Sequence, residues 1–228
     1  MRAKYTSRLI SAFLIVTVAA ACSDQGPEAT GDVDVTILQT DAFLAQVVSG
    51  FSASIVGSDD AMVQIDPDTV EALTIRIATI QVLPQGRDEA DNGDWVSLEM
   101  GSPVLLDLMS LPTEGESPLV IASGALEVGT YANVRLYTDS ASVSFKGPIS
   151  LGAAEDFEAG VDYLVDIPSG DQTGINTDVS FTVEAAAEGN ANDVALLFDS
   201  GSTFQNISAT GTGRVTLTPV IHDRGDRA

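Results

Sequence analysis

The chain has 228 residues, of which 33 are acidic and only 10 are basic, so its formal net charge at pH 7 is −23. A surface this negative repels the phosphates of nucleic acids, which excludes a nucleic-acid partner. The single cysteine excludes an intramolecular disulfide, and an apolar fraction of 44% is enough for a folded core rather than a disordered acidic tail.

The first 21 residues have the pattern of a secretory signal peptide. Residues 1–8 carry three positive charges and no acid, and residues 9–21 form an apolar run that ends in small side chains. A membrane-spanning helix needs roughly 20 apolar residues, which neither this run nor any later segment provides. We therefore expect residues 1–21 to be removed on export and the mature chain to have no membrane span of its own. Loss of the three basic residues would change the net charge from −23 to −26.

The residues Ala19 to Cys22 resemble the lipobox of bacterial lipoproteins, in which the cysteine becomes the lipidated first residue, although Ala19 stands where leucine is usual. The resemblance implies lipidation of Cys22 and anchoring to the bacterial cell envelope, where each buried CH₂ group contributes about 0.8 kcal/mol. Ser23 stands where an aspartate would favour inner-membrane retention, which indicates the outer membrane, on its periplasmic or surface side. Ordinary cleavage beside an incidental cysteine is the alternative.

Residues 22–50 are predicted to form a lipidated tether and leader segment ahead of the folded domain. The part from 23 to 32 is polar and interrupted by glycine and proline. The alternation of Val33–Leu38 allows a first strand, and Asp41 is placed to cap one or two helical turns over residues 41–48.

Residues 51–222 are predicted to form one all-β domain, followed by a flexible tail at 223–228. The expected strands are 51–56, 70–83, 95–98, 104–108, 131–137, 142–145, 161–167, 179–185, 194–198 and 214–221. Turns about every 8 to 14 residues, with no long helix, predict an antiparallel β-sandwich or an open barrel. Pro219 indicates an edge position or a strand end.

Three local predictions concern turns and faces. Asn92–Gly93 fits a type I′ hairpin, and Gly129 is expected to take a positive φ in a tight turn after Val128. In the long strand at 70–83, alternation places residues 73, 75, 77 and 79 on one face and residues 80 and 82 on the other.

Six short segments occur in an order typical of one bacterial family: Leu106–Leu111, Leu126–Leu136, Asp139–Val143, Pro168–Gly174, Leu197–Asp199 and Leu217–Ile221. Together they resemble the family known only as a domain of unknown function (number 4382), which is common in secreted lipoproteins. The resemblance extends over roughly residues 51–221, with Val128 and Ile175 departing from the usual pattern. It implies an immunoglobulin-like or prealbumin-like β-sandwich and implies no activity.

The acidic stretch at residues 88–94 is the sharpest candidate for a metal site. Ca²⁺ takes six to eight oxygen ligands, and Asp88, Asp91 and Asp94 offer carboxylates within one short loop. The spacing does not match an EF-hand, and a solvated hairpin tip is the alternative interpretation. Asp59, Asp60, Asp66 and Asp68 form a second, weaker acidic cluster. We therefore expect no cofactor, with Ca²⁺ as the alternative.

Catalytic patterns are poor in this chain. His222 is the only histidine, so a histidine-rich zinc site is excluded and a Ser-His-Asp triad would have to include the tail. The loop Pro168–Gly174 lacks the lysine of a phosphate-binding loop. Asp107, Arg135 and Asp199 are charges inside apolar strands, where a strand-end hydrogen bond or ion pair competes with a ligand site. We therefore expect no enzymatic activity.

These observations predict a lipid-anchored, exported β-sandwich of the cell envelope with a non-catalytic binding or structural role. Its partners would be the membrane, through the lipid, and an envelope protein or glycan. A calcium-dependent adhesion or carbohydrate-binding module is one alternative, and a carboxylate-based hydrolase is another. The ligand, the leaflet and the oligomeric state have no recognisable signal in the sequence.

Overall fold

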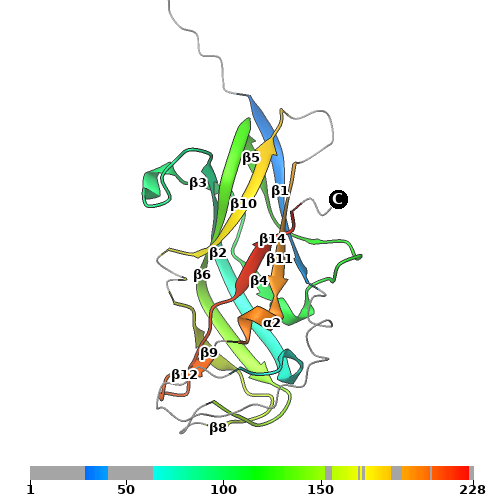
Figure 1. The fold of residues 1–228 in the computed structure, drawn as a ribbon, viewed down its shortest axis with the longest axis vertical. Helices are drawn as coiled ribbons and strands as arrows, with labels where there is room; N and C mark the ends of the chain where they lie inside the picture. Colours follow the sequence, from blue (N-terminus) through cyan, green and yellow to red (C-terminus); the bar gives the residue numbers. More distant parts are fainter. Residues whose placement is uncertain are drawn as a thin grey trace, which may run out of the picture.

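The computed structural model describes residues 29–40, 64–151, 156–168, 170, 173–185, 192–205 and 207–225. Two β-sheets face each other across one hydrophobic core, which confirms the all-β sandwich (Figure 1). Cys22, the strand predicted at 51–56, the helical turns predicted at 41–48 and the acidic pair Asp59–Asp60 lie outside the described residues.

The smaller sheet has four strands in the order β14 (Val220–Asp223), β11 (Asn192–Asp199), β1 (Thr30–Gln39) and β5 (Leu119–Glu127). β1 pairs with β5 in antiparallel and with β11 in parallel orientation, so the sheet is mixed rather than purely antiparallel. The side chains of Val33, Val35 and Ile37 are fully buried, as their alternation predicts. The sandwich thus includes a central strand ahead of residue 51, where the sequence placed the start of the domain.

The larger sheet is built around two long antiparallel strands, β2 (Val70–Pro84) and β6 (Gly129–Phe145). On the free edge of β2 lie β3 (Val96–Leu98) and β4 (Val104–Asp107). On the free edge of β6 lie β10 (Ile175–Val183) and β9 (Tyr163–Asp166), and β9 is followed outward by β13 (Val215–Thr216) and β12 (Ser208–Ala209). A separate hairpin joins β7 (Ile149–Ser150) to β8 (Asp156–Phe157).

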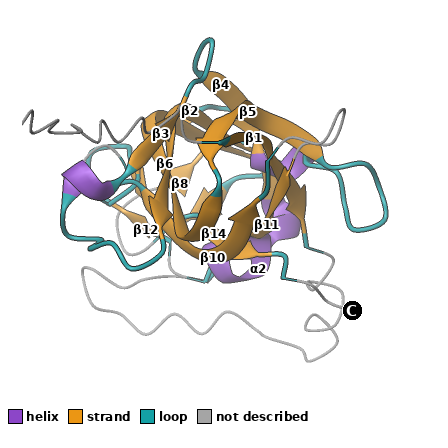
Figure 2. Cartoon of the chain, turned by 90° about the horizontal axis from the view of Figure 1, so that it is seen from above, coloured by secondary structure: helices purple, strands orange, loops and turns teal. Residues whose placement is uncertain are grey.

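The two sheets approach each other along both edges, and the strands surround the core when seen down the long axis (Figure 2). On one side Thr177 Oγ1 of β10 donates to the carbonyl oxygen of Ile221 of β14 at 3.2 Å. On the other side a Cβ on Gly124 of β5 would lie 3.2 Å from Leu98 Cδ2 of β3, a tighter contact than most Cβ atoms make, so glycine favours the close approach of the two strands.

The predicted faces of the long strand β2 are wrong beyond its midpoint. Leu73, Ile75 and Ile77 are fully buried, but so are Ile80 and Val82, all in the same core. The register with β6 shifts on both sides of Ile77, and an extra residue in a strand reverses the alternation of its side chains. The bulge therefore keeps both halves of β2 in contact with one core.

The segment around Val128 is a corner between the sheets rather than a hairpin turn. β5 ends at Glu127 in the smaller sheet, and β6 begins at Gly129 in the larger one. Gly129 pairs with Val183 of β10 and is not among the described glycines with a positive φ, so that prediction is wrong. β6 is also continuous through residues 138–141, where a connection between two strands was predicted.

The predicted last strand at 214–221 divides into β13 and β14, which belong to different sheets. Pro219 lies immediately before Val220, the first residue of β14, which confirms the predicted strand end. The one described α-helix, α2 (Ser200–Thr203), is a single turn. In the part of the chain that the structure describes, no helix has the length and apolar character needed to cross a membrane.

Candidate functional site

The middle of the β2–β6 pair contains two facing bulges. Arg76 pairs with Ser140 and Ile77 with Thr138, which leaves Asp139 of β6 without a counterpart. The next pair joins Thr79 to Tyr137, which leaves Ala78 of β2 without one. We call this region, residues 76–79 and 137–141, the waist. Bulges disrupt the ladder locally and are common beside active sites, which makes the waist a candidate site.

The flanking strands leave both outer edges of the waist open. β4 pairs with β2 as far as Ile77 and β3 pairs from Ile80 onward, so no described strand pairs with Ala78 or Thr79 on that edge. On the β6 side, β10 pairs up to Leu136, and β9 pairs only with residues 142 and 143. The Thr138 amide donates instead to the carbonyl oxygen of Gly170 at 3.0 Å. A hollow lies beside each of these two open edges.

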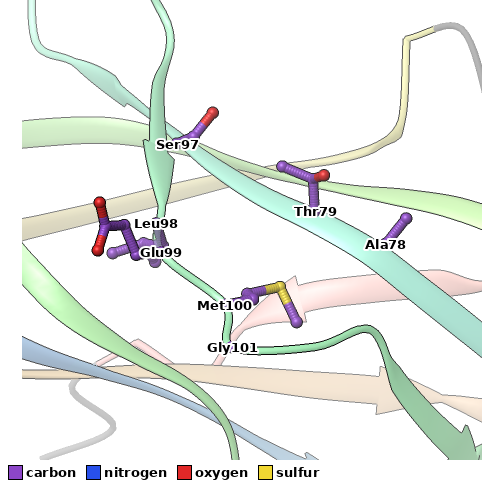
Figure 3. Close-up of a pocket in the computed structure, with 7 residues that line it drawn as sticks. All are labelled: Ala78, Thr79, Ser97, Leu98, Glu99, Met100 and Gly101. Carbon is purple, nitrogen blue, oxygen red and sulfur yellow. The ribbon is translucent and has the colours of Figure 1, made fainter.

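The first hollow, of about 530 Å³, lies between the β2 bulge and the segment that follows β3. Its lining residues are Ala78, Thr79, Ser97, Leu98, Glu99, Met100 and Gly101. Figure 3 shows Met100 on the same side of its loop as Ala78 and Thr79, with the Glu99 carboxylate extending away from them. The volume is within the usual range for small-ligand pockets, about 300–1,000 Å³. The lining offers apolar side chains, the hydroxyls of Thr79 and Ser97 and the carboxylate of Glu99.

The second hollow, of about 300 Å³, lies between the β6 bulge and β9. Its lining residues are Thr138, Asp139, Ser140, Ala141, Leu164, Val165, Asp166, Ile167 and Arg214. Asp139 is paired with Arg76, and Asp166 is paired with Arg214, whose Nε donates to Asp166 Oδ2 at 2.9 Å. Both pairs are partly exposed and contribute about 0–1 kcal/mol each. The hollow is thus electrically balanced and suits an uncharged polar ligand.

The acidic loop after β2 does not gather its carboxylates into one set. Asp88 Oδ1 accepts from the Ala90 amide at 2.9 Å, and Asp91 Oδ1 accepts from the Gly93 amide at 2.8 Å. Asp94 Oδ2 accepts from the Asp88 amide at 3.1 Å. In the described ranges, no group of three or more His, Cys, Asp or Glu side chains is placed to hold a metal ion. The three predicted ligands thus accept hydrogen bonds from backbone amides of their own loop.

The cap at Asp91 explains why Asn92–Gly93 is not a type I′ hairpin. Residues Asn92–Asp94 form a short 3₁₀ helix, η2, with Asp91 as its N-cap. A side-chain acceptor that satisfies a free amide stabilises such a start, and it competes with the hairpin geometry. Of the second acidic cluster, Asp66 likewise accepts from the Asp68 amide at 2.9 Å and caps a short 3₁₀ turn, η1 (Pro67–Thr69).

Arg135 attaches this loop to the outer face of the larger sheet. Its side chain is buried, Nε donates to Gln81 Oε1 at 2.7 Å, and Nη1 donates to Asn92 Oδ1 at 3.1 Å. The guanidinium carbon lies 4.0 Å from the ring centroid of Trp95 and 5.1 Å from that of Tyr137. Burial lowers the pKa of Arg135, and the neighbouring Tyr137 opposes that shift. The charge inside this apolar strand therefore has a structural role.

A second set of bonds holds the loop beside Arg135. Asn133 Nδ2 donates to Glu89 Oε1 and, at 3.3 Å, to Asp178 Oδ1 of β10. Trp95 Nε1 donates to the carbonyl oxygen of Glu89 at 3.2 Å. Trp95 and Glu89 thus fix the position of the acidic loop on the sheet.

Asp199 and His222 are brought together, but not as part of a catalytic triad. His222 Nε2 lies 3.7 Å from Asp199 Oδ2, and Ser202 Oγ donates to that same oxygen at 2.7 Å. A triad needs the imidazole between the hydroxyl and the carboxylate, whereas here the carboxylate is in the middle. Asp199 also accepts from the Ser202 amide at 2.9 Å and is the N-cap of α2. The arrangement caps a helix and leaves Ser202 without a base.

Asp107, the remaining charge in an apolar strand, is also a cap. Its Oδ1 accepts from the amides of Met109 at 3.0 Å and Leu73 at 3.2 Å, and its Oδ2 accepts from Ser110 Oγ at 2.6 Å. The 3₁₀ helix η3 (Leu108–Ser110) begins directly after it. The competing interpretation of this residue as a ligand is not supported by these bonds.

The comparison with protein families shows to which family the chain belongs. The model of the domain of unknown function DUF4382 matches residues 58–219. The chain belongs to the DUF4382 family. No curated protein and no solved structure matches it. In this DUF4382 protein the match includes the waist, both hollows and the acidic loop, whereas β1 and β14 of the smaller sheet lie outside the matched residues.

Proposed function

We propose that this protein is a lipid-anchored, exported β-sandwich of the bacterial cell envelope with a non-catalytic binding or structural role. The observation that carries the proposal is the position of Cys22, directly after a segment with the pattern of a signal peptide and eight residues before Thr30, where the first described strand begins. Acyl chains on that cysteine would place a folded domain at the membrane without any membrane-spanning helix.

The bonding of the polar side chains supports a role without covalent chemistry. Asp107 and Asp199 cap helical turns, and the carboxylates that line the second hollow are held in ion pairs. These carboxylates already have structural partners, which favours a role without acid–base chemistry. The two hollows at the waist are the places where a small ligand would fit, the first by apolar contact and the second by hydrogen bonding.

Metabolic labelling tests the anchor. Cells that express the protein and are grown with radioactive palmitate should yield labelled wild-type protein in the membrane fraction. The Cys22→Ala variant should be unlabelled and soluble, since the chain contains no other cysteine. The neighbouring substitution Ser23→Ala is the matched control and should retain both label and membrane association. Unlabelled wild-type protein, or a membrane-associated Cys22→Ala variant, would refute the proposal.

A further inference from the structure

The first strand begins at one end of the elongated sandwich, beside the corner between β5 and β6. Thr30 pairs with Glu127, and the Val128 amide donates to the carbonyl oxygen of Ala29 at 2.8 Å. We call this the anchored end, formed by residues 29–32, 127–129 and 183–184. β5 and β10 also reach this end in Figure 1.

The other end of the sandwich, the far end, is where β6 finishes. Phe145 is the last residue of β6, and its carbonyl oxygen accepts from the Gly160 amide at 2.9 Å. The rings of Phe145, Phe157 and Tyr163 pack together there, with centroid distances of 4.7–6.4 Å. β8 and β12 lie at this end, opposite the start of β1 (Figure 1).

Only the anchored end lies close enough to Cys22 to be held at the lipid surface. Eight peptide units join Cys22 to Thr30, which gives a reach of at most about 29 Å. The 17 residues of β6 span about 53 Å between the two ends. We infer that an acylated Cys22 holds the anchored end toward the lipid surface and leaves the far end directed away from it. This inference rests on the proposed function.

Charge at the anchored end gives this arrangement a preferred spacing. Asp32, Glu127 and Glu184 are all exposed there. Anionic lipid headgroups repel these carboxylates within a Debye length of about 10 Å at 0.1 M salt. The acyl chains therefore hold the anchored end within reach of the lipid surface, while repulsion of its carboxylates opposes close contact with anionic headgroups. The far end then stays accessible to a partner that does not touch the membrane.

Two matched valines test the orientation. Val128 at the anchored end is 46% exposed, and Val161 at the far end is 39% exposed. Acylation modifies both the thiol and the amine of Cys22. A cysteine introduced at position 128 or 161 is therefore the only free thiol of the acylated protein. Purified acylated Val128→Cys and Val161→Cys proteins would be labelled with a thiol-reactive fluorophore. They would then be reconstituted on phosphatidylethanolamine–phosphatidylglycerol vesicles that carry a headgroup-linked energy acceptor.

Energy transfer to the lipid acceptor should be several-fold stronger from position 128 than from position 161. Equal transfer, or stronger transfer from position 161, overturns the orientation while leaving the anchor intact. Wild-type protein treated with the same fluorophore provides the second readout and should remain unlabelled. If it takes the label, Cys22 is a free thiol, and the anchor fails together with the inference built on it.

Discussion

Replacement of Arg135 by methionine should release the acidic loop from the larger sheet and destabilise the domain. Methionine keeps most of the aliphatic volume but removes the donors to Gln81 and Asn92 and the charge stacked on Trp95. Hydrogen bonds from a charged group contribute about 1.5–3 kcal/mol each, and a cation–π contact about 0.5–2 kcal/mol. Relief of the buried charge offsets part of this loss, so the expected decrease in unfolding free energy is about 2–4 kcal/mol.

Urea denaturation followed by tryptophan fluorescence measures this decrease, because Trp95 is the only tryptophan and is 7% exposed in the folded chain. The native emission of the Arg135→Met variant should also shift to longer wavelength as the ring becomes solvated. Arg76→Met is the matched control, since the Arg76–Asp139 pair is partly exposed and should cost at most about 1 kcal/mol. Wild-type stability and emission in Arg135→Met would refute the assignment of Arg135 as the residue that holds the loop.

Three further predictions concern the anchored end and the acidic loop. Gly31→Ala should lower the unfolding free energy by about 1–3 kcal/mol, because the new Cβ would lie 2.0 Å from the Glu184 carbonyl oxygen. Gly101 has open space around it, so Gly101→Ala should leave the unfolding free energy unchanged in the same urea assay. Burial, followed by repulsion from Glu127, raises the pKa of Tyr131. Stability should therefore fall as the pH rises above about 10, where the unfolded phenol ionises first, and alkaline denaturation of Tyr131→Phe should show a smaller fall. Calorimetric titration with Ca²⁺ should give no saturable heat and no rise in melting temperature, because the three predicted ligands accept from backbone amides instead; a saturable signal would contradict that role.

Strand positions could be predicted from local alternation in most of the chain. The expected strand at 70–83 is observed as Val70–Pro84, and the one at 194–198 as Asn192–Asp199. The order of short motifs also predicted the family. The strand positions and the family could be predicted because both depend on residues that are neighbours in the sequence. A pleated strand repeats every two residues, and a motif requires only adjacent letters.

The candidate site could not be predicted, because no local pattern marks a bulge. Ala78 and Asp139 become unpaired only when two strands about 60 residues apart are aligned against each other. The hollows then arise where β3 and β4, or β9 and β10, fail to meet along the same edge. Arg135 did carry a signal, as a charge inside an apolar strand, but its stacking on Trp95 depends on where the acidic loop folds.

By itself, the sequence determined the all-β composition, the approximate strand positions and the family. Tertiary structure decided which strands are neighbours, and it did so against local expectation at several places. Val128 joins two sheets instead of closing a hairpin, the segment at 214–221 contributes to both sheets, and Val35 pairs in parallel with Val194. The physical reason is that alternation specifies which side chains must be buried, whereas the partner that buries them is selected by packing among residues far apart in the chain.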